Sequence, residues 1–220
     1  MKRLFLIRPK QGKYEQLTHE RKRLGRAGVA SAFFASLFSL TVVHASPASA
    51  ACYHGQKWSS ASGHQVVQST SSVPSGWNAA IQNSGSSWNG KSKWSFTMSG
   101  WGTSGPPFQG GWVSVGVTPG GAVGFTTLSN GSAAGTIVWA NTTLKSGLTF
   151  TTNGSQNGTS TWDVRNIVTH ELGHWPSLDH NQGCGSAPYY GAVLDSPWWS
   201  NQVFYSPNAD DIAGLASIYP

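Results

Sequence analysis

Hydrophobic residues in the last third of the chain recur with the period of an α-helix. Within residues 161–175 the apolar positions are spaced so that they fall on one side of a helix. These apolar residues are Val164, Ile167, Val168 and Leu172. A second helix is predicted at the end of the chain, where Ser206 can act as the N-cap and Pro207 suits the first turn. Its apolar residues at helical spacing are Ile212, Leu215 and Tyr219.

Shorter segments earlier in the chain alternate between apolar and polar residues, as half-buried strands do. These segments are residues 94–98, 112–117, 121–127 and 136–141. Each is bounded by Gly, Asn or Pro, which favour turns. A further helix is predicted in residues 74–82, where Trp77 and Ile81 lie one turn apart. Because strands dominate the first part and helices the last, we expect residues 51–220 to form one α+β domain.

Charge is distributed unevenly along this sequence. Charged residues make up 10% of the chain, against about a quarter in typical soluble proteins. The formal net charge of +6 comes from the start of the chain, because residues 1–50 hold nine basic and two acidic residues. Residues 51–220 hold five scattered basic residues and six acidic ones. A nucleic-acid-binding domain needs a basic face of its own, so the composition excludes that class of partner.

Residues 1–50 have the pattern of a secretory signal peptide. A basic stretch at residues 21–26 precedes an uncharged run at residues 27–43, and the small residues Ala48 and Ala50 suit a signal-peptidase cleavage site. The alternative is an uncleaved membrane anchor, but the apolar run is shorter than the roughly 20 residues that a span needs. We therefore expect cleavage near Ala50 and a secreted, extracellular protein.

Export bears on the only two cysteines, Cys52 and Cys184. Pairs of thiols tend to be oxidised outside the cytoplasm, so we predict a disulfide bond between them. The alternative is a pair of free, buried thiols.

Residues 170–180 contain the side chains that point to metal binding and catalysis. On a helix, His170 and His174 lie one turn apart and direct two imidazoles at one point. Glu171 lies one residue further round, where its carboxylate can act as a general base towards a water on the metal. Pro176 ends the helix, and His180 follows the turn as a third ligand. Three imidazoles with an open fourth position predict one catalytic zinc ion.

Two other interpretations of this segment remain open. The histidines could be core residues hydrogen-bonded to the backbone. This would leave Glu171, the single glutamate of residues 51–220, without a role, although three of the five histidines there fall in this segment. A closed structural zinc site would require a fourth protein ligand, and Asp179 is the nearby candidate.

The segment from Thr169 to His180 resembles the metzincin signature HExxHxxGxxH, and its residues THELGH and LDH are similar to the matrixin branch of zinc metalloendopeptidases. Residues 192–194 (AVL) and 208–219 (NADDIAGLASIY) resemble the Met-turn and the C-terminal helix of that family. The resemblance implies a metzincin-like catalytic domain over residues 51–220. Such a domain has a twisted mixed β-sheet, an N-terminal helix, a zinc-binding active-site helix and a C-terminal helix.

The chain departs from the family pattern at several positions. Ser177 replaces a glycine that has a positive φ in the family, and Leu194 replaces the methionine of the Met-turn. Leucine is close to methionine in volume, so we expect a small effect there. No histidine lies between residues 65 and 169 to form the second, structural zinc site of animal matrixins. Calcium is compatible with the family, but no calcium ligands can be assigned.

The resemblance implies a secreted zinc-dependent endopeptidase that hydrolyses internal peptide bonds of proteins, with Glu171 as the general base. It also implies that an extended protein or peptide substrate pairs with an edge strand, which we expect at residues 135–143. Asp210 and Asp211 resemble family residues that brace the C-terminal helix. We expect a monomer without nucleic-acid partners and without stable membrane association after signal cleavage.

A function of a different class is a non-catalytic secreted binding module, for example for a polysaccharide, that retains the metal site as a relic. The chain has 11 tryptophans, which we expect mainly in core and turn packing. Exposed aromatic platforms at Trp101 or at Trp198 and Trp199 would instead favour sugar binding. Replacement of Glu171 by alanine separates the two classes, because only an enzyme would lose its activity.

Overall fold

The computed structural model describes residues 53–58, 64–101, 110–130, 135–180, 192–194 and 201–220. The predicted signal peptide, Cys52 and Cys184 lie outside these residues, as do Trp198 and Trp199. None of the helices within the described residues is both long and apolar enough to cross a membrane.

The main sheet has six strands in the order β1-β6-β4-β2-β3, with β5 paired to β6. The strands are β1 (Lys57–Trp58), β2 (His64–Ser69), β3 (Ser95–Trp101), β4 (Gly110–Gly116), β5 (Gly124–Asn130) and β6 (Thr136–Lys145). Every pairing in this sheet is parallel except that of β5 with β6. A second, two-stranded parallel sheet joins β7 (Thr149–Thr151) to β8 (Thr161–Asp163).

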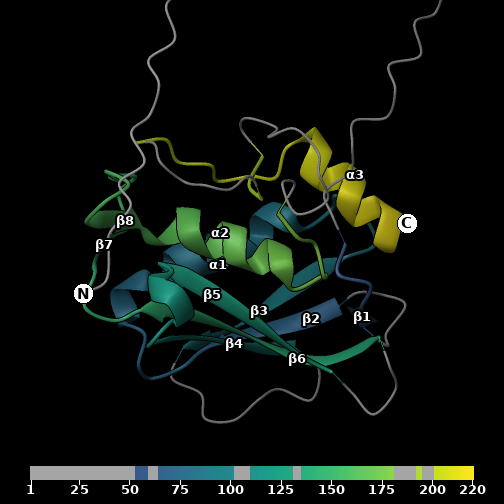
Figure 1. Ribbon diagram of the computed structural model, residues 1–220, viewed down its shortest axis with the longest axis horizontal. Coiled ribbons are helices and arrows are strands. Elements are labelled where there is room, and N and C mark those ends of the chain that lie inside the picture. Colours follow the sequence, from purple (N-terminus) through teal and green to yellow (C-terminus); the bar gives the residue numbers. More distant parts are fainter. Residues whose placement is uncertain (1–52, 59–63, 102–109, 131–134, 181–191, 195–200) are drawn as a thin grey trace, which may run out of the picture. The chain divides into compact units, whose positions relative to one another are not determined.

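Three α-helices occur within the described residues: α1 (Asn78–Trp88), α2 (Val164–His174) and α3 (Ala209–Ile218). Two short 3-10 helices, η1 (Ser75–Trp77) and η2 (Pro119–Gly121), precede α1 and β5 respectively. Figure 1 shows α1 and α2 on one face of the main sheet, with α3 on the side of α2 that lies away from the sheet. The described part is therefore mixed α and β structure, consistent with the predicted α+β class.

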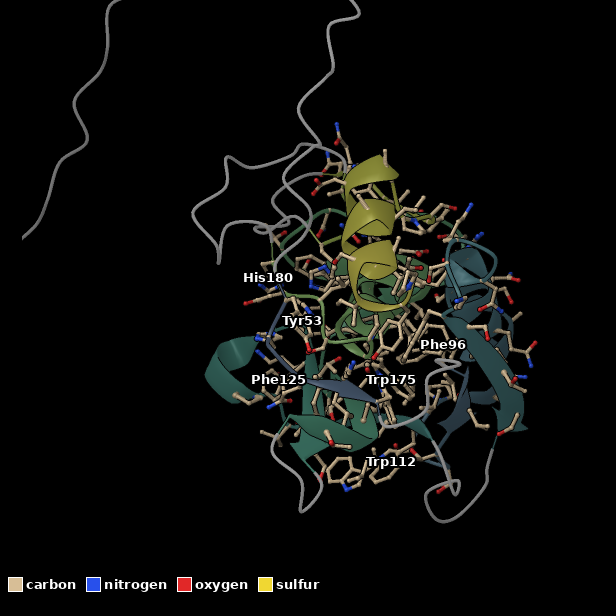
Figure 2. The ribbon with its side chains drawn as sticks, turned by 90° about the vertical axis from the view of Figure 1, so that its right-hand side faces the viewer. Tyr53, Phe96, Trp112, Phe125, Trp175 and His180 are labelled. Atoms are coloured by element: carbon tan, nitrogen blue, oxygen red, sulfur yellow. The ribbon has the colours of Figure 1, made fainter. Side chains whose placement is uncertain are left out.

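The core lies between the helices and the sheet and is rich in aromatic side chains. Trp94 is fully buried, and its ring centroid lies 5.4 Å from that of Phe96 and 4.8 Å from that of Tyr219. Phe96 in turn meets the buried Trp175 edge to face, as Figure 2 allows the reader to follow. Trp112 lies on the other side of the sheet, stacked on Trp139. Most of the described tryptophans thus serve packing.

Three expectations about the elements need correction. Residues 161–163 belong to β8 rather than to the helix, because the Asp163 side chain accepts the Asn166 N–H and so caps α2 at Val164. The cap of α3 is Asn208 rather than Ser206, and Asn208 forms a capping box with Asp211.

The third correction concerns the edge strand, which was expected at residues 135–143. Strand β6 is interior, because it pairs with β4 on one side and with β5 on the other. Among the described residues β5 pairs only with β6, so β5 forms the free edge beside α2.

Candidate metal centre

Helix α2 is largely buried, and its apolar residue Ile167 lines the same cleft as His170 and Glu171. The four apolar residues predicted to share a side are all at most 4% exposed: Val164, Ile167, Val168 and Leu172. Gly173 allows this close packing, because a Cβ there would lie 2.7 Å from Cζ2 of Trp88 and 2.9 Å from Cδ2 of Leu194. The packing against α1 and against residues 192–194 therefore determines which side of α2 faces the cleft.

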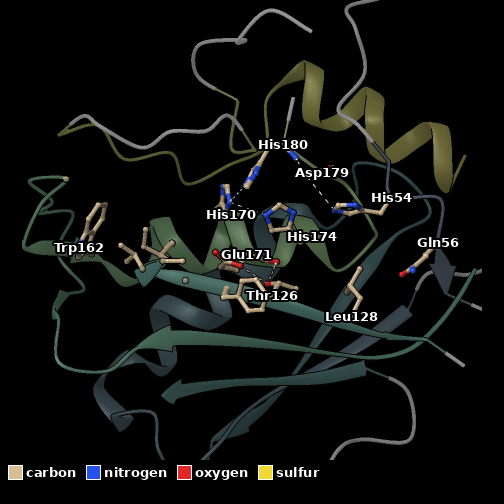
Figure 3. Close-up of a pocket in the computed structure, with 16 residues that line it drawn as sticks. His54, Gln56, Thr126, Leu128, Trp162, His170, Glu171, His174, Asp179 and His180 are labelled. Atoms are coloured by element: carbon tan, nitrogen blue, oxygen red, sulfur yellow. Dashed lines mark hydrogen bonds and ion pairs between the residues drawn. The ribbon is translucent and has the colours of Figure 1, made fainter. Parts of the chain in front are cut away.

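The three predicted histidines converge through the same ring atom. Nε2 of His170 lies 3.2 Å from Nε2 of His174 and 3.0 Å from Nε2 of His180. The ligand atoms of the three residues lie within 4.8 Å of one another. Figure 3 shows the three rings directed towards one another at the wall of a cleft.

The opposite nitrogens of two of these rings are held by backbone carbonyls. Nδ1 of His170 donates to the Val193 carbonyl at 2.7 Å, and Nδ1 of His174 donates to the Leu178 carbonyl at 2.8 Å. Because each Nδ1 carries the proton, each Nε2 presents a lone pair to the centre of the cluster. Burial is the main cause that lowers the pKa of His174 to about 4 and the pKa of His170 well below its usual range. The neutral imidazole is the form that binds a metal ion.

The spacing is compatible with a single metal ion bound by all three histidines. In a tetrahedral site with Zn–N bonds of about 2.0–2.1 Å, two ligand nitrogens lie roughly 3.4 Å apart. The two Nε2 separations of 3.0 and 3.2 Å are slightly shorter than this value. Three convergent nitrogen donors can therefore hold one divalent ion. Asp179, the candidate fourth ligand of a closed site, is not part of the group.

Glu171 lies in the same cleft, beside the histidines and below them in Figure 3. Its Oε2 accepts a hydrogen bond from the Thr126 hydroxyl at 2.7 Å. Trp175 Nε1 donates to the Thr142 hydroxyl at 3.0 Å, and the Thr142 and Thr126 hydroxyls lie 2.9 Å apart. Because Thr142 accepts the Trp175 N–H, its own hydroxyl can donate to Thr126, and the Thr126 hydroxyl donates to Oε2 of Glu171. Burial raises the pKa of Glu171 to about 7, against the lowering effect of Thr126.

Strand β5 passes very close to the Glu171 side chain, and this close approach requires a glycine at position 124. A Cβ at Gly124 would lie 2.6 Å from Oε1 of Glu171 and 2.8 Å from Cγ2 of Ile167. The same strand carries Thr126, so β5 both covers the carboxylate and donates a hydrogen bond to it.

The cleft has a volume of about 770 Å³ and extends to both sides of the histidines. Trp162 lies towards one end, whereas Gln56, Leu128 and His54 lie towards the other (Figure 3). An extended ligand could therefore pass the three histidines with chain on either side of them.

The two departures from the family pattern have clear structural outcomes. Ser177 has a φ of 78°, so the turn keeps the left-handed conformation without a glycine. Its hydroxyl is buried and has no hydrogen-bond partner among the described residues. Leu194 is fully buried and packs against α2 at Gly173.

Asp211 links the last helix to the metal centre. Its Oδ2 accepts the Val193 N–H at 2.8 Å, and its Oδ1 accepts the Leu194 N–H at 3.2 Å. The Val193 carbonyl in turn holds His170. Asp211 therefore supports both α3 and the histidine, in line with the bracing role expected for it.

Sequence reasoning did not identify Thr126, Gly124 or His54 as parts of the site. Thr126 and Gly124 fall within a predicted strand, but nothing local indicates that this strand crosses α2. His54 could have been considered, as one of only five histidines in residues 51–220. No known protein family matches this chain, and no curated protein matches it in sequence.

Proposed function

We propose that this chain is a secreted zinc-dependent endopeptidase similar to the matrixin branch of the metzincins. The observation that supports this most strongly is the convergence of three Nε2 atoms, 3.0 and 3.2 Å apart, beside a buried carboxylate in an open cleft. Clusters of this composition suit a catalytic zinc ion with one position open. The metzincin-like fold is part of the proposal.

His170, His174 and His180 would hold the ion, and Val193 and Leu178 would orient two of these rings. When bound, zinc supplies Lewis-acid polarisation of a carbonyl oxygen and lowers the pKa of water. Glu171 would take a proton from the attacking water and then deliver it to the leaving amine, so that a carboxylate and an amine are formed. Thr126 would hold Oε2 of Glu171 during both transfers.

The substrate would be an extended protein or peptide chain in the cleft. Strand β5 offers a free edge among the described residues, directly beside Glu171. An extended chain can add to such an edge through backbone hydrogen bonds. Because the cleft continues on both sides of the histidines, bonds within a chain would be cleaved rather than only terminal bonds. The proposal includes export, a Cys52–Cys184 disulfide bond and a monomeric state.

The decisive test is replacement of Glu171 by glutamine. The variant should still bind one zinc ion per chain, because Glu171 lies outside the group of three ligands. Its hydrolysis of casein or of a fluorogenic peptide library should fall by about 100- to 10,000-fold, the usual contribution of a general base. Zinc content is measured on the same samples by mass spectrometry. A zinc-loaded wild type that cleaves no member of the library would favour the binding module and contradict the proposal.

A further inference from the structure

The described N-terminal segment, Tyr53–Trp58, lies against the turn that connects α2 to the third histidine. The His54 N–H donates to the Ser177 carbonyl at 3.0 Å. Tyr53 forms an antiparallel bridge with Leu178, and Trp58 Nε1 donates to the Trp175 carbonyl at 2.7 Å. The segment therefore contacts the turn at its beginning and in its middle.

This turn holds two of the three ligands. The Leu178 carbonyl accepts the hydrogen bond from Nδ1 of His174. The Asp179 carboxylate accepts the His180 N–H at 2.7 Å. A displacement of the turn would therefore move His180 directly and would also change the orientation of His174.

The turn is also strained. Ser177 has a positive φ, a backbone conformation that is unfavourable for a residue other than glycine. Such strain persists only where the surrounding contacts hold the backbone in place. The contacts of Ser177 and Leu178 with the N-terminal segment are contacts of this kind.

The His54 side chain adds a contact that reaches the ligand itself. Its Nε2 lies 3.5 Å from Oδ1 of Asp179, the same oxygen that accepts the His180 N–H. Both side chains line the cleft, and Figure 3 shows His54 beside His174 with a dashed line to Asp179. Asp179 thus lies between His54 and the backbone of His180.

We propose that His54 is a positioning residue for the metal centre, which acts through Asp179 to hold His180 in place. The N-terminal segment would thereby set the affinity of the site for its ion. The inference rests on the proposed function only for the identity of that ion as zinc. Residues that orient metal ligands typically contribute about 10- to 100-fold to metal affinity.

The test measures zinc affinity by competition with a chromophoric chelator. His54→Ala should weaken zinc binding about 10-fold, the lower end of the usual range, because the contact between His54 and Asp179 is partly exposed. His54→Gln keeps an N–H donor near Asp179 and should restore part of the loss. Lys57→Ala is the matched control, since Lys57 belongs to the same segment and its side chain is exposed, and it should bind zinc as the wild type does.

A double-mutant cycle separates positioning from general support of the fold. If His54 acts through Asp179, His54→Ala combined with Asp179→Ala should weaken zinc binding no more than Asp179→Ala alone. The melting temperature of the metal-free protein should be the same for His54→Ala and Lys57→Ala. Unchanged affinity in His54→Ala, fully additive losses, or a parallel fall in metal-free stability would each overturn the inference.

Peptide hydrolysis is measured on the same samples, which keeps the two proposals distinguishable. A wild type that binds zinc but cleaves nothing would contradict the endopeptidase and leave the affinity comparison intact. An active His54→Ala variant with wild-type zinc affinity would overturn the positioning role and leave the endopeptidase intact.

Discussion

At the scale of single residues, the proposed function depends on how Glu171 and the histidines are oriented. Glu171 and two of the histidines each have a partner that fixes one polar atom of the side chain. Thr126 holds one oxygen of Glu171, while the carbonyls of Val193 and Leu178 hold the Nδ1 atoms of two rings. The other oxygen of Glu171 and the Nε2 atoms of the rings are the atoms that the proposed chemistry uses.

Thr126→Val tests the partner of the carboxylate. The variant keeps the shape of the side chain but removes a hydrogen bond to a charged group, which contributes about 1.5–3 kcal/mol. We expect zinc content to remain at one ion per chain while kcat falls about 10- to 100-fold. Thr127→Val is the control, because Thr127 is exposed and faces away from Thr126 on the same strand. Equal kcat values for the two variants would show that Thr126 does not support Glu171.

Ser177→Gly tests the strained turn. Glycine adopts a positive φ readily, and the change also removes a buried hydroxyl that has no partner among the described residues. We expect the free energy of unfolding of the metal-free protein to rise by about 1 kcal/mol, as measured by urea denaturation. A decrease in the free energy of unfolding would mean that the serine side chain stabilises the folded protein by more than its positive φ destabilises it.

At the scale of elements, the site depends on how closely α2 approaches its neighbours. Gly173 meets Trp88 of α1 and the buried Leu194, and Gly124 of β5 meets Glu171 and Ile167. Both glycines are positions where a side chain would force the elements apart. The contact between elements thus sets the position of the Glu171 carboxylate.

Gly173→Ala should destabilise the protein although alanine favours helices. Overpacking costs about 1–3 kcal/mol, more than the roughly 1 kcal/mol that alanine gains in a helix interior. Thermal unfolding should show a lower melting temperature than for Gly76→Ala, where a Cβ would meet no atom within 4 Å. Equal melting temperatures would indicate that α1 and α2 can separate without cost.

The sequence predicted features that depend on one continuous segment better than features that depend on contacts between distant segments. Helix α2 and its three histidines were predictable, because apolar period and ligand spacing lie within one continuous segment. Strand β2 was not, since its sequence HQVVQS has only two adjacent apolar residues. The roles of Thr126 and His54 were not predictable either, although His54 stood out as one of few histidines, because their contacts arise from sheet register and from a chain segment distant in sequence.

At the scale of the whole molecule, three distant parts of the chain meet at the metal centre. Helix α2 and its turn supply the three histidines, and Asp211 of α3 supports residues 193–194 behind His170. The N-terminal segment supports the turn through Ser177 and Asp179. Because these supports come from both ends of the described chain, binding of an ion should stabilise the entire fold.

We propose that one zinc ion bound by three histidines makes this protein a peptidase. The most direct measurement is the rate of peptide hydrolysis as metal-free protein is titrated with zinc. We expect no hydrolysis without zinc, a linear rise, and a break at one equivalent per chain. Hydrolysis that persists after complete removal of metal, or that is still absent at one bound equivalent, would contradict the account.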